Sequence, residues 1–222
     1  MTDRLAPGAT LGILGGGQLG RMLALAAARL GFKAHIFDPA PDGPAAQVAA
    51  ATTVAAYDDP AALAAFAGAV DVVTYEFENV PAGALDLVRA HAPIRPGRRA
   101  LAVSQDRLEE KTFLAGIGLA TAPFAAVDAP QDLAAAVEIT GLPAILKTRR
   151  FGYDGKGQIR LSSADPAALD ALNGAPAILE GFVSFRREVS VIAARGLDGS
   201  IVAFEPGENV HRDGILHTTT VP

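Results

Sequence analysis

Cysteine is absent from the sequence, and its absence removes several kinds of chemistry. Disulfides, thiolate metal sites and cysteine nucleophiles are all excluded. No apolar run reaches the roughly 18 residues that a membrane span requires, and residues 15–18 interrupt the early apolar stretch where a secretory signal would lie. The formal net charge is −5 with dispersed basic residues, which argues against general nucleic-acid binding. We therefore expect a soluble cytoplasmic protein without a nucleic-acid or membrane partner.

Glycine and basic residues are concentrated in one short stretch, residues 145–161. Two β-prone runs flank a loop that contains Gly152, Gly155 and Gly157, and glycine lets the backbone come close to a ligand because it has no Cβ. Lys147, Arg149, Arg150, Lys156 and Arg160 place positive charge around this loop. Free backbone N–H groups and cations together suit polyphosphate binding. The stretch therefore predicts a β-hairpin that binds phosphates.

This loop differs from a Walker A motif, which leads from a strand into a helix and has Ser or Thr after its lysine. Here Gln158 follows Gly157, and a second strand follows the loop. A glycine-rich hairpin with solvated charges is the alternative interpretation.

Residues 10–38 predict a strand, a glycine turn, a helix and a second strand. The turn at residues 15–20 fits GxGxxG, and Asp38 stands at the end of the second strand, which is the pattern of a Rossmann-like βαβ unit. The N-terminus of a helix at such a turn binds any anion, so the pattern alone does not specify NAD. A tight turn without a ligand is the alternative.

Acidic and amide side chains follow the buried strand predicted at residues 70–75. Ligands of open parallel sheets bind beyond the carboxyl ends of the strands, which makes Glu76, Glu78 and Asn79 candidate substrate contacts. These residues could instead cap the helix that starts near Pro81. A polar helix is expected at residues 101–114, from which Arg107 or Lys111 could reach inward.

The second half of the chain continues with alternating helices and strands. We expect helices at residues 132–140 and 165–172, and strands at 124–127, 177–183 and 187–195, the last followed by a hairpin turn at 197–200. Glu180 ends a buried run and precedes Gly181, which resembles a hinge over an adenine. Glu188 and Ser190 share one face of their strand.

Taken together, these motifs resemble the ATP-grasp superfamily and, within it, the 5-(carboxyamino)imidazole ribonucleotide synthetases. The matching segments are GGGQLGRM at 15–22, TYEFENVP at 74–81, DRLEEKTFL at 106–114, LKTRRFGYDGKGQ at 146–158, EGFVSFRREVSV at 180–191 and ENVHRDGIL at 208–216. They occur in one order over nearly the whole chain, so the combined match is specific although each segment alone is weak.

The resemblance implies an α/β fold in three parts. Residues 1–105 would form a Rossmann-like pre-ATP-grasp domain, residues 106–188 an ATP-grasp lid subdomain of α+β type with the glycine-rich hairpin, and residues 189–222 the incomplete start of the central ATP-grasp subdomain. Family members continue past Pro222, so the ligands for Mg²⁺ are expected beyond that residue and none within this chain. The family also suggests a homodimer.

The implied activity is that of an ATP-dependent ligase in de novo purine biosynthesis. ATP would phosphorylate bicarbonate to carboxyphosphate, and the amine of 5-aminoimidazole ribonucleotide would capture the carbon dioxide, with ADP and phosphate as the other products. This chain alone could be inactive.

Residue roles follow from the resemblance, position by position. Arg107 and Lys147 match phosphate-binding cations, Glu188 a ribose ligand, and His211 a histidine of the nucleotide site. The implied ATP contacts are Arg107, Lys147, Gly152, Tyr153, Asp154, Gly155, Lys156, Gly157, Gln158, Glu180, Gly181, Phe182, Val183, Glu188 and His211. The implied catalytic residues are Tyr153, Asp154 and Lys156, and the implied substrate contacts are Gly17, Gln18, Leu19, Glu76 and Asn79.

Three alternatives stay open. Another ATP-grasp carboxylase or a formate-dependent transformylase would share most of these motifs. An NAD-dependent oxidoreductase would use the glycine turn and Asp38. A non-catalytic fragment is the third alternative.

Overall fold

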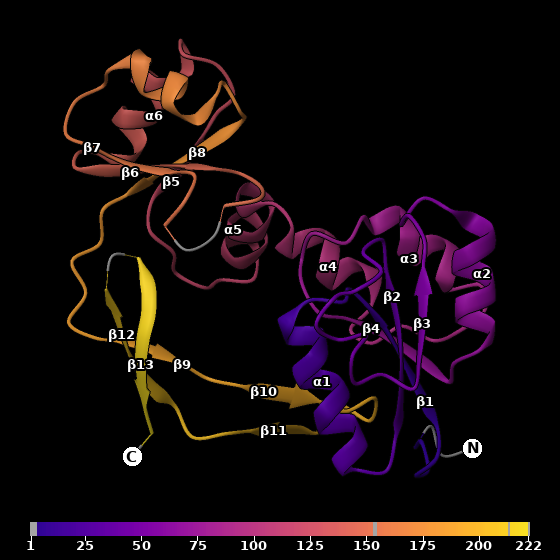
Figure 1. Ribbon diagram of the computed structural model, residues 1–222. Coiled ribbons are helices and arrows are strands. Elements are labelled where there is room, and N and C mark those ends of the chain that lie inside the picture. The colour runs from indigo at the N-terminus through magenta and orange to yellow at the C-terminus, as the bar shows by residue number, and fades with distance from the viewer. Residues whose placement is uncertain (1–3, 153–154, 213, 222) are drawn as a thin grey trace. The chain divides into compact units, whose positions relative to one another are not determined.

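A computed structural model describes residues 4–152, 155–212 and 214–221 (Figure 1). The chain divides into two compact units, Met1–Asp106 and Arg107–Pro222, and each is described by itself. None of the described helices is both long enough and apolar enough to cross a lipid bilayer.

The first unit is built on a parallel four-stranded sheet in the order β3-β2-β1-β4. The strands are β1 (Thr10–Leu14), β2 (Lys33–Asp38), β3 (Ala51–Val54) and β4 (Val72–Tyr75). Leu14 lies opposite both Phe37 and Tyr75. The carboxyl ends of β2, β1 and β4 are therefore aligned, and the glycine turn and Glu76 follow directly from them. The predicted Rossmann-like start of an α/β fold is confirmed.

Helices cover both faces of this sheet because its strands are apolar on both sides. They are α1 (Gln18–Arg29), α2 (Pro60–Gly68), α3 (Ala82–Val88) and α4 (Arg98–Ser104). Leu14 and Phe37 pack with Leu63 and Phe66 of α2 in one core cluster. The alternate strand position Ile13 packs in a second cluster that includes Ala24 of α1. Strand alternation thus places α1 and α2 on opposite faces.

The second unit contains an antiparallel sheet in the order β5-β8-β6-β7 (Figure 1). Its strands are β5 (Phe124–Val127), β6 (Ala144–Thr148), β7 (Gln158–Leu161) and β8 (Ala177–Gly181), and its helices are α5 (Arg107–Gly116), α6 (Asp132–Thr140) and the 3₁₀ helix η1 (Pro166–Leu172). Leu146 and Leu179 face a core that includes Leu133 and Leu169. The alternating positions Lys147 and Glu180 consequently lie on the opposite face of the sheet.

The remaining strands form two smaller sheets near the C-terminal end. They are β9 (Glu188–Ser190), β10 (Ala193–Arg195), β11 (Ile201–Ala203), β12 (Gly207–Arg212) and β13 (Ile215–Thr220). The order β13-β12-β9 defines one sheet, and β10 pairs with β11 across the predicted turn, where the Gly196 N–H donates to the Ser200 carbonyl at 2.7 Å. Large apolar side chains of β11, Ile201 and Val202, are exposed, as are the neighbouring Ile192 and Phe204.

Three predicted elements differ from the structure. The single strand expected at residues 187–195 is wrong, because this segment forms β9 and β10, which belong to different sheets. The single helix expected at residues 101–114 is wrong, because the chain forms α4 and α5 with a break at Gln105 and Asp106. The Gln105 side chain donates to the Val80 carbonyl, and the Arg107 N–H donates to the Arg149 carbonyl at 3.0 Å, so these polar groups bond outside a continuous helix. The helix expected at residues 165–172 is of the tighter 3₁₀ type.

Asp59 illustrates how local sequence sets a helix start in the first unit. Its Oδ1 accepts hydrogen bonds from the N–H groups of Ala61 and Ala62, both at 3.0 Å, and Pro60 occupies the first helical position. We expect Asp59→Ala to lower the free energy of unfolding by about 1 kcal/mol, the usual effect of losing an N-cap. Urea unfolding measures this. Asp58→Ala removes the same charge from the exposed neighbouring residue, and an equal loss in both variants would contradict the capping role.

Candidate functional site

Arg107 ties α5 to the entrance of the glycine-rich hairpin. Its Nη1 donates to the Thr148 carbonyl at 2.9 Å, and its Nη2 donates to the Gly152 carbonyl at 2.6 Å. The guanidinium thus links the end of β6 to the start of the loop through one hydrogen bond to each. This geometry requires the planar fork of arginine, which lysine lacks.

Two of the loop glycines pack closely against the end of β6. A Cβ on Gly152 would lie 3.0 Å from Thr148 Oγ1 and 3.1 Å from the Lys156 carbonyl oxygen. Gly157 has φ +68°, and a Cβ there would lie only 2.7 Å from Thr148 Oγ1. The Thr148 N–H donates to the Gly157 carbonyl at 2.8 Å. Close packing therefore favours glycine at position 152, and both packing and backbone conformation require it at position 157.

The other predicted loop residues are exposed or lie outside the described part of the chain. Gly155, Lys156 and Gln158 are exposed or lie at the start of β7. The predicted catalytic residues Tyr153 and Asp154 lie outside the described residues.

Lys147, Lys111 and Glu180 form a compact group of charges beside this hairpin. The Glu180 carboxylate is nearly buried, with a residue exposure of 7%. Its Oε2 lies 3.0 Å from Lys147 Nζ and 3.4 Å from Lys111 Nζ. Burial of a carboxylate is tolerated when it is paired in this way. The predicted phosphate cation and the predicted adenine-side glutamate are thus in direct contact.

The chain after Glu180 is anchored by its backbone. The Gly181 N–H donates to the Pro123 carbonyl at 2.9 Å, and the Phe182 N–H donates to the Pro143 carbonyl at 3.0 Å. The Arg160 guanidinium lies 4.3 Å from the centre of the Phe182 ring, within the range of a cation–π contact. Val183 is half exposed. The segment predicted to contact adenine therefore leaves β8 along a defined path.

Glu188 and His211 are brought together from different strands. His211 Nδ1 lies 3.2 Å from Glu188 Oε1. β9 and β12 pair antiparallel, with Glu188 opposite Asn209, so His211 lies two residues further along the same face. The family resemblance assigned both residues to the nucleotide site, and nothing in the sequence indicated that they touch.

The glycine turn of the first unit holds carboxylates of the protein itself. Glu76 accepts hydrogen bonds from the Gly17 N–H, at 2.7 Å to Oε1, and from the Gly20 N–H at Oε2. The Gly16 N–H donates to Asp38 Oδ2 at 2.7 Å. The N-terminus of α1, which attracts anions, is thus occupied by two side chains. Sequence reasoning placed Glu76 toward a substrate and missed this bonding.

Tyr57 is a second residue that sequence reasoning missed at this turn. Its hydroxyl donates to Asp38 Oδ2 at 3.3 Å. Burial, together with the neighbouring Asp38 carboxylate, raises the pKa of the Tyr57 hydroxyl well above its usual value, so Tyr57 stays a neutral donor. The tyrosine follows the edge strand β3 without a recognisable motif, and no signal in the sequence pointed to it.

The remaining predicted substrate residues lie around the turn. Gln18 and Leu19 are exposed in the first turn of α1. The Asn79 side chain donates to Glu78 Oε1 at 3.3 Å. Because Gln18 and Leu19 are exposed, their side chains are accessible to a ligand.

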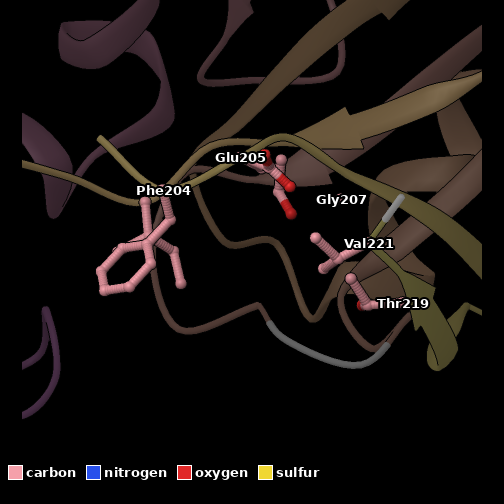
Figure 2. A pocket seen from close by; sticks show the side chains of 7 residues that line it. Phe204, Glu205, Gly207, Thr219 and Val221 are labelled. Carbon is pink, nitrogen blue, oxygen red and sulfur yellow. The ribbon is translucent and has the colours of Figure 1, made fainter.

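A hollow of about 410 Å³ lies among the C-terminal strands (Figure 2). It is lined by Ser190, Ile192, Phe204, Glu205, Gly207, Thr219 and Val221. These residues include no lysine or arginine, so the hollow does not suit a phosphate group. Among the described residues, no three His, Asp or Glu side chains are grouped to hold a metal ion.

Comparison with known proteins identifies both units. Residues 8–105 match the ribonucleotide synthetase preATP-grasp domain, and residues 112–222 match the ATP-grasp domain. The N5-carboxyaminoimidazole ribonucleotide synthase of Brucella melitensis is 57% identical, over 98% of this chain and 61% of its own length.

Solved structures of such enzymes are similar to the chain. An ADP complex of an N5-carboxyaminoimidazole ribonucleotide synthetase has a TM-score of 0.92 at 43% identity, covering 99% of this chain and 59% of that one. The Aspergillus clavatus enzyme in complex with ADP and 5-aminoimidazole ribonucleotide has a TM-score of 0.83 at 30% identity, covering 95% of this chain and 56% of that one. The chain thus spans about 60% of the length of these relatives.

We expect Glu76→Ala to destabilise the first unit, because two backbone N–H groups at the start of α1 would lose their acceptor. Such a loss costs about 1–3 kcal/mol. Urea unfolding and amide hydrogen exchange at Gly17 and Gly20 measure the effect. Glu78→Ala is the matched control, because that residue is exposed and its carboxylate accepts a hydrogen bond from the adjacent Asn79 side chain. Unchanged exchange at both glycines would contradict the role of Glu76.

Proposed function

The chain belongs to the ATP-grasp family, and from that membership we propose that it forms the ATP-binding part of an enzyme that carboxylates 5-aminoimidazole ribonucleotide. The observation that supports this most directly is the meeting of Lys111, Lys147 and Glu180 beside the glycine-rich hairpin that Arg107 anchors. Cations next to a glycine loop suit a polyphosphate, and enzymes of this family bind ATP.

In the proposed reaction, a bicarbonate oxygen attacks the γ-phosphorus of ATP, and ADP leaves. The carboxyphosphate formed breaks down to carbon dioxide and phosphate. The exocyclic amine of the ribonucleotide then attacks the carbon dioxide and loses a proton, which gives the N5-carboxyamino nucleotide. Catalysis of phosphoryl transfer depends mainly on positioning and on stabilisation of negative charge.

The residues of this chain would share these tasks between two sites. Lys147 and Arg107 would hold the phosphates and the hairpin over them, while Glu188 and His211 would contact the ribose side of the nucleotide. Lys156, with Tyr153 and Asp154, would face the reacting centre. Closure of the residues 152–158 would exclude water, so that carbon dioxide is captured before it escapes.

The glycine turn favours a substrate contact over a dinucleotide cofactor. A pyrophosphate at the N-terminus of α1 would have to displace the carboxylates of Glu76 and Asp38, which carry the same sign of charge. The ribonucleotide would therefore contact Gln18, Leu19 and Asn79 at the rim of the turn, with Glu76 and Gly17 beneath. Bicarbonate as the carbon source, Mg²⁺, a homodimer and a cytoplasmic location belong to the same proposal and are supported by the family resemblance.

We expect Lys147→Ala to weaken ATP binding by about 1.5–3 kcal/mol, the usual effect of losing a charge-assisted hydrogen bond to phosphate. Isothermal titration calorimetry measures the affinity. Lys147→Arg tests whether any cation suffices, since the two side chains differ in reach and in donor geometry. Equal affinities of Lys147→Ala and the unaltered chain would contradict the phosphate contact.

Variants in the two units should affect the KM values of the two substrates differently. In the full-length enzyme, Gln18→Ala should raise the KM for 5-aminoimidazole ribonucleotide severalfold and leave the KM for ATP unchanged, because a lost neutral hydrogen bond costs about 1 kcal/mol. Glu188→Ala should do the reverse. Gln18 is a cleaner probe than Glu76, which also supports the turn.

The assay is ADP release with each substrate varied in turn, with bicarbonate or with formate as the carbon source. If both variants change only the ATP requirement, the two-site assignment is wrong. ADP release that depends on formate instead of bicarbonate would identify the transformylase alternative. Tight NADH binding that Asp38→Ala abolishes would overturn the ATP-grasp assignment of the turn.

A further inference from the structure

One oxygen atom of Glu180 is shared by two lysines from different elements. Lys147 comes from β6 and Lys111 from α5, and both ammonium groups approach Oε2. The three side chains are mostly shielded from solvent, with exposures of 24% for Lys147, 18% for Lys111 and 10% for Glu180. The arrangement is more elaborate than a buried carboxylate needs, because one cation would suffice to neutralise it.

The position of Lys111 follows from the anchoring of its helix. Arg107 and Lys111 are four residues apart and therefore lie on one face of α5. The bonds of Arg107 to the Thr148 and Gly152 carbonyls fix that face against β6 and the loop. Lys111, one turn further along, is thereby held over β8, where Glu180 lies.

Binding of a nucleotide phosphate by Lys147 would weaken the ion pair between Lys147 and Glu180. A phosphate would draw the Lys147 ammonium away from Oε2, since both are anions that compete for one cation. A buried carboxylate that loses its partner is strongly destabilised. The loss of the Lys147–Glu180 contact would therefore oppose nucleotide binding unless a second cation stays beside the Glu180 carboxylate.

We propose that Lys111 is a positioning residue that keeps Glu180 paired when Lys147 turns to the nucleotide phosphates. The proposal rests on the proposed function, because it takes Lys147 as a phosphate contact. Lys111 acts through Glu180 and itself needs no contact with the phosphates. Its effect on affinity must therefore depend on the presence of the Glu180 carboxylate.

The first test is ADP binding by calorimetry with the 222-residue chain. Lys111→Met keeps the length of the side chain and removes the charge, and we expect it to weaken ADP binding about tenfold or more, in line with the usual strength of a charged hydrogen bond. Lys111→Arg should restore most of the affinity. Lys33→Met is the matched control, because it removes the same charge from an exposed position on β2 of the first unit.

The second test places the same change in a Glu180→Gln background. Without the carboxylate there is no charge for Lys111 to hold, so Lys111→Met should change ADP affinity less than twofold there, as expected of coupled residues. An equal loss in both backgrounds would show that Lys111 acts on the nucleotide directly and would overturn the proposal. Thermal unfolding of each variant identifies any that fail to fold, and Lys111→Arg then provides the comparison.

The outcomes distinguish this inference from the proposed function. If the unaltered chain binds ADP, Lys147→Ala weakens binding and Lys111→Met binds as tightly as the unaltered chain, only the role of Lys111 is overturned. If the unaltered chain binds no ADP, the proposed nucleotide site fails and the role of Lys111 fails with it.

Discussion

Pairing of a buried carboxylate is the constraint on which the second unit depends. Glu180 is buried because β8 alternates, placing Leu179 in the core and Glu180 on the opposite face beneath α5. A charge there is stable only with a cation beside it. β6 supplies one at Lys147 and α5 supplies another at Lys111. The positions of the hairpin, the helix and the strand are thus related through one oxygen atom.

Carboxylates play a similar part in the first unit, with backbone donors in place of lysines. Glu76 follows β4 and bonds to the N–H groups at the start of α1, and Asp38 is the last residue of β2 and bonds to Gly16. The ends of three neighbouring strands are thereby joined around one helix terminus. The same pattern of glycines that would admit a phosphate here supports internal bonds, which shows that a glycine motif identifies a geometry and leaves the ligand open.

Local patterns predicted most of the elements and less of the site. Two β-prone runs around a glycine-rich loop predicted the hairpin, and the GxGxxG turn predicted the βαβ unit, because both patterns depend on neighbours in sequence. The break at Gln105 was missed because its cause is a bond to Val80, 25 residues earlier. The contact between Glu188 and His211 likewise depends on the register of β9 with β12. Such long-range pairings leave no trace in a single sequence.

The C-terminal strands have a consequence for the chain in solution. β13 is paired on one side only among the described strands, and the apolar side chains of Ile215 and Leu216 on it are half exposed. An open strand edge beside exposed apolar groups is a template for pairing with another copy of the same strand. Pairing of a further strand with this edge would bury these apolar side chains and complete the backbone hydrogen bonds of β13.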